Sequence, residues 1–273
     1  MKKIYLTGIS VVLISLLLFG FTDYTNIKTK DPGTEQGEQW RSLFNGVNLD
    51  GWTVKIKGYP LGENIHNTFR VEDSILKVSY DGYGNSFGEA YGHIFYKKPF
   101  SSYRLRLSYR FVGEQPADGQ EWAYKNSGIM IHSQAPESMA LDQGFPVSLE
   151  VQLLGGKTPG IERPTGNLCT PGTHVDMNGQ QVMEHCIQAD APTFYGNEWV
   201  EVEIEVYRDS LIRHIINGKE VIRYSNPVYG GEFLPDTDFW RSMDGQPVTG
   251  GYISLQSESH PVEFKKIELL ELK

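Results

Sequence analysis

The chain has 273 residues and a formal net charge of −9, with 22% charged and 12% aromatic residues. The aromatic content argues against a disordered chain, and the 29 glycines and 14 prolines argue against a helical bundle. An acidic chain without a basic stripe is not expected to bind a nucleic-acid backbone. The length is compatible with one large all-β domain.

Residues 1–22 have the pattern of a secretory signal peptide. Lys2 and Lys3 precede an apolar run over residues 4–21, and a positive start followed by an apolar run is typical of export signals. We expect this segment to be cleaved. An uncleaved membrane anchor is the alternative, because no clear small-residue cleavage site follows and the run is just long enough to span a bilayer. The sequence therefore predicts an exported protein with no other membrane contact.

The rest of the chain is predicted to be a polar spacer, residues 23–39, followed by a single domain over residues 40–273. Short β-branched and aromatic runs alternate with turn residues throughout this domain. Such spacing predicts an all-β antiparallel β-sandwich. The longest helical segment expected is a turn or two near residues 138–143. The predicted strands span residues 69–71, 75–80, 94–96, 103–112, 128–132, 147–154, 199–207, 211–216, 221–224, 252–256 and 262–272.

Alternation of side chains predicts which face of each strand is buried. Over residues 103–111 and 200–206 the apolar side chains share one face. Glu201, Glu203 and Glu205 fall on the opposite face, where we expect them to be solvated.

Three strands differ because their polar faces carry amide, carboxylate, imidazole and phenol groups, which hydrogen-bond directionally to sugar hydroxyls. Such faces suit a concave ligand surface better than an ordinary solvated sheet. Sequence alone does not place the three strands side by side. Their polar faces are formed by Asn126, Gly128, Met130 and His132; by Ser148, Glu150 and Gln152; and by Tyr252, Ser254, Gln256 and Glu258.

Cys169 and Cys186 are the only cysteines. Because an exported chain meets an oxidising compartment, we expect them to form a disulfide, which would stabilise the fold by about 3 kcal/mol. Two buried free thiols are the alternative. The segment between them is rich in turn residues and is predicted to be a loop.

Several motifs in this chain resemble the 3-keto-disaccharide hydrolase domain family. The resemblance covers residues 40–272 and implies a concanavalin A-like jelly-roll sandwich in an exported bacterial enzyme, periplasmic or at the cell surface. It further implies a hydrolase or a lyase acting on 3-keto glycosides. The insert at residues 157–194 departs from a minimal family member. The matching motifs are WRSLFNGVNLDGW at 40–52, NSGI at 126–129, EVQ at 150–152, NG at 217–218, GYISLQSE at 251–258 and VEF at 262–264.

The chemistry of such substrates sets what the site must supply. A ketone at C3 of a pyranose acidifies the hydrogen at C2, because the carbanion is delocalised as an enolate. A base can then remove that proton and expel the group at C1, and addition of water would complete a net hydrolysis. The reaction needs a base, an acid for the departing oxygen and donors that stabilise the enolate. A companion 3-dehydrogenase would supply the oxidised glycoside.

We predict Glu150 or His132 as the base and Glu258 or His174 as the acid. Structural roles are the alternative for each histidine, and a paired structural carboxylate is the alternative for Glu150. Loop packing is the alternative for Tyr124 and Trp122, and a surface ion pair for Arg163. The predicted substrate-binding residues are Asn126, Gln152, Gln256, Tyr124, Trp122 and Arg163.

No metal-binding motif or cofactor fingerprint occurs in the sequence. A divalent metal held by His132, Glu150 and His174, polarising the C3 ketone, is the alternative to a cofactor-free site. Two other functional classes also remain open. One is an ordinary glycosidase that uses Glu150 and Glu258, and the other is a non-catalytic, lectin-like carbohydrate-binding module.

Overall fold

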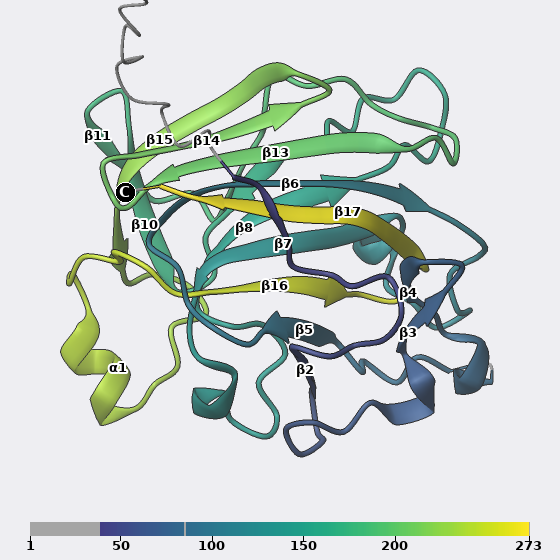
Figure 1. Cartoon of the computed structure of the whole chain (residues 1–273). Helices are drawn as coiled ribbons and strands as arrows, with labels where there is room; N and C mark the ends of the chain where they lie inside the picture. Colours follow the sequence, from purple (N-terminus) through teal and green to yellow (C-terminus); the bar gives the residue numbers. More distant parts are fainter. Residues whose placement is uncertain (1–38, 85, 273) are drawn as a thin grey trace, which may run out of the picture. The chain divides into compact units, whose positions relative to one another are not determined.

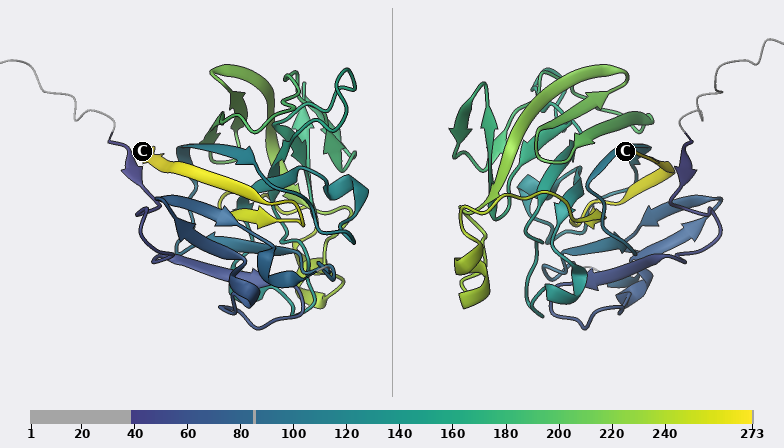
Figure 2. Two further views of the ribbon diagram at one scale, coloured as in Figure 1. Left: turned by 90° about the vertical axis from the view of Figure 1, so that its right-hand side faces the viewer. Right: turned by 60° about the vertical axis from the view of Figure 1, so that its left-hand side comes forward.

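Two antiparallel β-sheets pack against each other in the computed structural model (Figures 1 and 2). The structure describes residues 39–84 and 86–272. The predicted signal segment and all but the last residue of the predicted spacer lie outside these residues. Every predicted strand is present, and the predicted all-β antiparallel sandwich is confirmed.

The first sheet has ten strands, and β1 (Arg41–Ser42) joins it by pairing with β17. This ten-stranded sheet lies on the side of the sandwich away from the candidate site described below. Its other strands follow in the order β11 (Gln180–Val182), β10 (Thr173–Met177), β15 (Lys219–Tyr229), β14 (Leu211–Ile216), β13 (Val200–Tyr207), β6 (Ser102–Phe111), β17 (Val262–Glu271), β4 (Ile75–Val78) and β3 (Phe69–Glu72).

The second sheet has seven strands and carries the three polar-faced segments. Every strand that contributes to the candidate site described below belongs to this sheet. The order is β12 (Cys186–Ile187), β9 (Asn167–Cys169), β8 (Leu149–Leu154), β7 (Asn126–Ser133), β16 (Tyr252–Ser257), β5 (Gly92–Tyr96) and β2 (Trp52–Ile56).

The core lies between the sheets and follows the predicted alternation. In β6, Tyr103 and Leu105 are fully buried, as is Ile204 in the neighbouring β13. In β8 the aliphatic side chains of Leu149 and Val151 are fully buried from the other sheet. Burial of these side chains supplies most of the driving force for folding and leaves the opposite faces of the strands for other roles.

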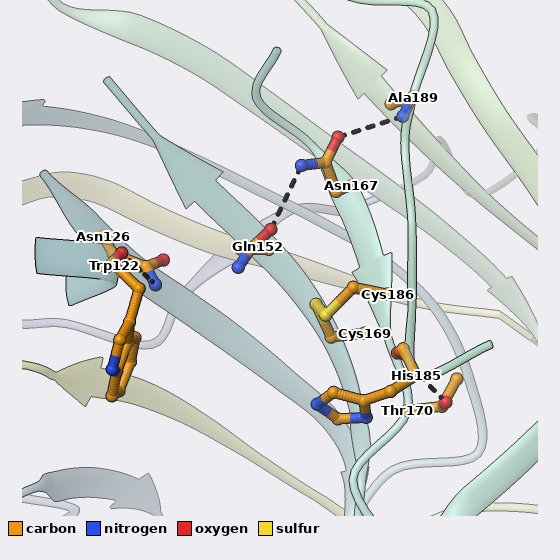
Figure 3. The surroundings of a disulfide bond; sticks show 9 residues. All are labelled: Trp122, Asn126, Gln152, Asn167, Cys169, Thr170, His185, Cys186 and Ala189. Atoms are coloured by element: carbon orange, nitrogen blue, oxygen red, sulfur yellow. Dashed lines mark hydrogen bonds between the residues drawn. A yellow bond between two sulfur atoms is a disulfide. The ribbon is translucent and has the colours of Figure 1, made fainter. Parts of the chain in front are cut away.

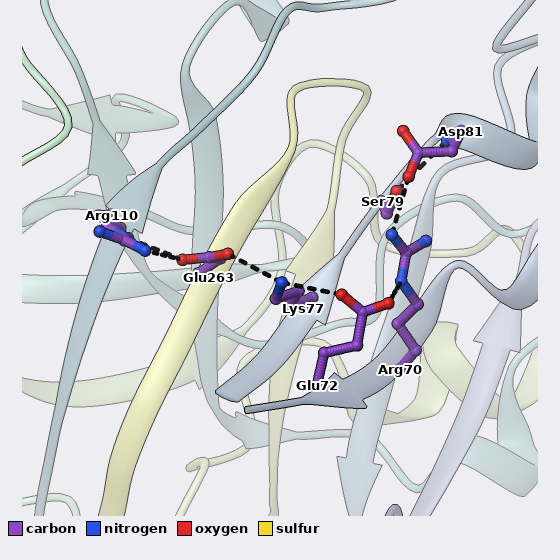
Figure 4. A network of polar contacts seen from close by, with 7 residues as sticks. All are labelled: Arg70, Glu72, Lys77, Ser79, Asp81, Arg110 and Glu263. Carbon is purple, nitrogen blue, oxygen red and sulfur yellow. Dashed lines mark hydrogen bonds and ion pairs between the residues drawn. The ribbon is translucent and has the colours of Figure 1, made fainter. Parts of the chain in front are cut away.

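The outer face of the ten-stranded sheet is paired by charge. Across four neighbouring strands, Arg110 bonds to Glu263, Lys77 contacts both Glu263 and Glu72, and Arg70 joins Glu72 to Asp81 (Figure 4). Further along this face, Arg104 binds Glu203 and Glu205. Two residues of the predicted acidic stripe are therefore partners of arginine rather than simply solvated.

The segment between the two cysteines is not the loop that the sequence predicts. It contains β10 and β11, which form an antiparallel hairpin. Asn178 and Gly179 make its turn with φ of 53° and 77°, as expected for an Asn-Gly hairpin turn. The turn residues that suggested a loop are thus the connection of a hairpin.

Helical structure differs from the expectation in position. A short 3₁₀ helix spans Pro136–Ser138, just before the predicted segment. The α-helix of the described residues, α1 (Asp238–Met243), lies in the connection between β15 and β16 (Figure 1) and was not predicted. The Thr237 side chain caps it by accepting a hydrogen bond from the Trp240 N–H. Within residues 39–84 and 86–272, no helix is long and apolar enough to cross a membrane.

Candidate active site

The three polar-faced strands are neighbours, in the order β8–β7–β16. Glu150 of β8 is paired with Met130 of β7, and Gln152 with Gly128. Ile129 of β7 is paired with Leu255 of β16, and both are fully buried in the core. Because side chains alternate along each strand, the polar residues of these regularly paired stretches lie together on the outer face.

A pocket of about 320 Å³ opens on this face. Its floor is formed by buried polar side chains of the sheet, and its rim by half-exposed aromatic rings. Glu150 and Asn126 are 7% and 4% exposed, whereas Trp122 and Phe233 are each 50% exposed. The lining residues are Trp122, Asn126, Phe145, Glu150, Gln152, Cys169, Pro171, His185, Cys186, Phe233 and Glu258.

Two buried carboxyl groups, those of Glu150 and Glu258, line this pocket. Burial raises the pKa of Glu150 to about 8. Burial and the neighbouring Glu150 charge raise the pKa of Glu258 well above its usual range, against the opposing effect of Arg163. Near pH 8, where Glu150 loses its proton, the pair therefore still retains one proton, so Glu258 can act as an acid while Glu150 acts as a base.

Gly128 makes room for the Glu150 carboxyl group. A Cβ atom at position 128 would lie 2.6 Å from Oε1 of Glu150, closer than van der Waals contact permits. The glycine of the Asn-Ser-Gly motif thus lets the carboxyl group lie over the neighbouring strand.

The orientation of the Gln152 amide follows from a chain of hydrogen bonds (Figure 3). The backbone N–H of Ala189 donates to Oδ1 of Asn167 at 3.0 Å, and Nδ2 of Asn167 donates to Oε1 of Gln152 at 3.1 Å. Because a backbone N–H can only donate, each amide in the chain has one orientation. Gln152 therefore keeps its Nε2 donor for the pocket.

Asn126 offers a complementary acceptor. Its Nδ2 donates to the Trp122 carbonyl at 3.4 Å, and its buried Oδ1 has no partner among the described residues. An unpaired buried acceptor costs free energy until a ligand donor reaches it. Together, Asn126 and Gln152 supply one acceptor and one donor to the pocket.

Gln256 is fully buried on β16, directly opposite His93 of β5. It is not among the residues that line the pocket. Both of its amide atoms and both ring nitrogens of His93 lack partners within the described part of the chain. Burial, together with the nearby Lys55, lowers the pKa of His93 to about 3, so the ring is neutral.

The predicted Cys169–Cys186 disulfide is confirmed. It joins β9 to β12 at directly paired positions and forms part of the pocket wall. His185 precedes it and lines the same pocket, with its ring 4.8 Å from that of Phe233 (centroid to centroid). His185 is not among the predicted site residues, although its position beside Cys186 is a usable signal.

Two predicted catalytic histidines lie elsewhere. A β-bulge in the pairing of β7 with β16 interrupts the alternation before His132, which has a φ of 48°. Its Nε2 lies 2.8 Å from the carbonyl oxygen of Arg208, on the β13–β14 hairpin of the other sheet. His174 lies on β10 with its ring against Gly230 and Gly231. Neither histidine lines the pocket.

Tyr124 and Arg163 lie beside the pocket but line a separate one of about 360 Å³. The Arg163 guanidinium donates to the backbone carbonyl groups of Trp122, Tyr124, Lys125 and Gly155. Arg163 thus holds the loop that carries Trp122, and among the described residues it does not form the surface ion pair considered for it. Tyr124 packs edge to face against the buried His260.

The structure does not gather the metal ligands considered from the sequence. Glu150 lies in the pocket, while His132 and His174 point to other parts of the fold. Across residues 39–84 and 86–272, no three His, Cys, Asp or Glu side chains are grouped as a metal site.

Fold and site together define an antiparallel β-sandwich with an acidic pocket on one sheet. The 3-keto-α-glucoside-1,2-lyase-like domain model matches residues 39–270, and the chain belongs to this family. Membership supports a carbohydrate-acting role. No curated protein matches the chain.

The chain is similar to several solved structures. A candidate glycosyl hydrolase from Parabacteroides distasonis ATCC 8503 is 18% identical, with a TM-score of 0.51 over 86% of this chain and 100% of that chain. A second such structure from this organism is also 18% identical, with a TM-score of 0.49 over 89% and 99% of the two chains. A carbohydrate-binding module, CBM66 from Bacillus subtilis, is 10% identical, with a TM-score of 0.43 over 81% and 96%. Of these three, the first has a TM-score above 0.5, and at 18% identity it shows a shared fold alone.

Proposed function

We propose that this protein is an exported enzyme that cleaves 3-keto glycosides by elimination. The observation that carries the proposal is the pair of buried carboxyl groups, Glu150 and Glu258, in one pocket of a 3-keto-α-glucoside-1,2-lyase-like domain. Elimination from a 3-keto sugar needs one base and one acid, and this pair supplies both.

In the proposed reaction, the carboxylate of Glu150 takes the proton from C2 of the sugar. The C2–H electron pair forms the C1=C2 bond through the enolate, and the C1–O bond breaks. The protonated carboxyl group of Glu258 gives its proton to the departing oxygen. The products are the aglycone alcohol and an unsaturated 3-keto sugar, to which water adds in a net hydrolysis.

The assignment of the two roles follows their environments. The pKa of Glu258 is raised by burial and by Glu150, so Glu258 holds a proton. The pKa of Glu150 is about 8, so Glu150 gains its charge in the working range of a general base. The Nε2 donor of Gln152 is suited to stabilise the enolate oxygen.

The decisive experiment compares 3-keto glucosides with the matching unoxidised glucosides and follows release of the aglycone. Wild-type protein is expected to cleave only the 3-keto form. Glu150→Gln should lose at least about a hundredfold in turnover of every substrate, because no base remains. Glu258→Gln should lose as much with an alkyl aglycone but far less with a 4-nitrophenyl aglycone, which leaves without protonation.

Glu201→Gln is the matched control, because it removes one carboxylate from the outer face of the other sheet. Equal cleavage of unoxidised glucosides would contradict the proposal and favour an ordinary two-carboxylate glycosidase. Sugar binding without any turnover would favour a lectin-like module.

Export is part of the proposal and rests on the sequence. The predicted signal at residues 1–22 lies outside the described residues, and the disulfide suits an oxidising compartment such as the bacterial periplasm or cell surface. A companion 3-dehydrogenase is required by the chemistry, since a sugar must be oxidised at C3 before elimination. Fractionation of cells that express the full chain tests the location.

A further inference from the structure

We infer that the aglycone of the substrate is an apolar group rather than a second sugar, and that an aromatic aglycone is preferred. The inference rests on the proposed function and adds the class of leaving group. Its basis is the contrast between the pocket floor, which is polar, and the rim, which is a wall of aromatic rings.

Five rings follow one another around the pocket. Trp122 stacks on Tyr91 with centroids 5.8 Å apart, and Tyr91 lies 5.3 Å from Phe145. Phe145 lies 6.4 Å from Phe233, and Phe233 lies 4.8 Å from His185. All of these except Tyr91 line the pocket. The half-exposed Trp122 and Phe233 leave apolar surface available to a ligand.

Polar groups are concentrated on the floor. Asn126, Glu150 and Gln152 come from the sheet, and Glu258 follows β16 directly. These groups suffice to orient one sugar ring. Apart from Glu258, the surrounding loops contribute one polar lining residue, His185; the others are Trp122, Phe145, Pro171 and Phe233.

A second sugar at this rim would bring several hydroxyl groups to a wall that offers few partners. Hydroxyl groups that lose water without gaining a hydrogen bond destabilise the complex. An apolar or aromatic aglycone avoids this cost and gains stacking on the exposed rings. A volume of about 320 Å³ also lies near the lower limit for small-molecule sites, which suits one sugar ring with a compact substituent.

The loop that presents Phe233 is held in place. The backbone N–H of Gly172 donates to the Glu232 carbonyl at 2.7 Å, and that of Gly230 donates to the Gly172 carbonyl at 3.0 Å. Phe233 itself has a φ of 68°, a left-handed conformation that is strained for a bulky residue. Strain of this kind concentrates at ligand-binding positions.

The test compares methyl and benzyl 3-keto glucosides, in both anomeric forms, with a 3-keto disaccharide of glucose. Methanol and benzyl alcohol are leaving groups of similar acidity, so their comparison isolates the contribution of the ring. For wild-type protein, kcat/KM is expected to be at least about tenfold higher for the benzyl than for the methyl substrate. Trp122→Ala and Phe233→Ala should each remove most of this preference.

Phe239→Ala is the matched control, because Phe239 is 61% exposed on α1 and does not line the pocket. Calorimetric binding of the same ligands to Glu150→Gln separates the inference from the proposed function. Selective binding of the benzyl ligand to this variant supports the aromatic rim, whether or not wild-type protein turns over any substrate. Absence of turnover by wild-type protein would overturn the proposed elimination and not this inference. Equal or tighter binding of the disaccharide, or a benzyl preference unchanged in both alanine variants, would overturn the inference.

Discussion

At the scale of single residues, alternation along a strand identified most of the pocket floor. Glu150 and Gln152 stand opposite buried aliphatic side chains in β8, and Asn126 begins β7 on the same face. The same rule failed for His132, because one bulge shifts the register and turns that residue toward the other sheet. A strand sequence does not reveal where its partner skips a residue.

Asn167 was not selected from the sequence, yet it fixes which end of the Gln152 amide faces the pocket. In Asn167→Asp, both carboxylate oxygens can only accept, so Gln152 must turn its Nε2 toward residue 167 and its Oε1 toward the substrate. We expect kcat/KM to fall about tenfold, the loss of one hydrogen bond to a developing charge. Steady-state kinetics with a 3-keto glucoside measures this effect, and thermal unfolding should show a lower Tm, because the new carboxylate is buried at a position that is 5% exposed.

A mutant cycle separates this positioning role from a general structural one. In a Gln152→Ala background, Asn167→Asp should change kcat/KM very little, because the amide that it orients is absent. An undiminished loss in that background would show that Asn167 acts by another route.

At the scale of elements, the segment between the cysteines forms the hairpin of β10 and β11, and its last residue, His185, is part of the pocket wall. The disulfide joins β12 to β9 at positions whose Cα atoms are 4.1 Å apart. Apart from the disulfide, little of the sheet holds β12. It has two residues, and within the described part of the chain it pairs with β9 alone. The wall that contains His185 is therefore held by this covalent link together with the hydrogen bonds that the Thr170 N–H and hydroxyl donate to the His185 carbonyl.

The double variant Cys169→Ser, Cys186→Ser should lose about 3 kcal/mol of unfolding free energy, as loop closure predicts for a crosslink of this span. It should also bind the benzyl 3-keto ligand more weakly, because β12 and His185 are then held less firmly. Denaturant unfolding with and without a reductant measures the first effect. The reductant should destabilise the wild-type protein and leave the double variant unchanged, and equal stability of the two proteins would contradict this account.

At the scale of the whole molecule, buried ionisable groups of two kinds set the pH dependence of stability. Burial lowers the pKa of His93 to about 3 and that of His214 and His260 to about 4. Below pH 6.5 these histidines bind protons in the unfolded chain but stay neutral in the folded protein. The free energy of unfolding therefore falls as the pH is lowered. Glu150 and Glu258 have raised pKa values, so the folded protein keeps protons on these groups that the unfolded chain has lost. These two carboxyl groups therefore lower the free energy of unfolding as the pH rises toward about 8, the pKa of Glu150.

The carboxyl effect begins near pH 4.5 and overlaps the histidine effect, but three histidines outweigh two carboxyl groups below about pH 6.5. Stability is therefore expected to be greatest near pH 6.5 and to fall as the pH rises above it. Thermal unfolding from pH 4 to pH 9 measures this curve. In Glu150→Gln the decline above pH 6.5 should be shallower, because one of the two responsible groups no longer titrates. A decline of the same steepness in that variant would show that the carboxyl pair is not its cause.

The sequence by itself determined the sandwich, the eleven main strands, the buried face of the strands with clear alternation (His132 excepted) and the residues of the polar floor. These are local properties, because a period of two along a strand fixes which side chains share a face. Only the tertiary structure decided that β8, β7 and β16 are adjacent, that Glu150 and Glu258 share a pocket, and that Phe145, His185 and Phe233 close around it. Strand order and loop packing depend on contacts between residues far apart in the chain, and the pattern within one segment carries no record of them.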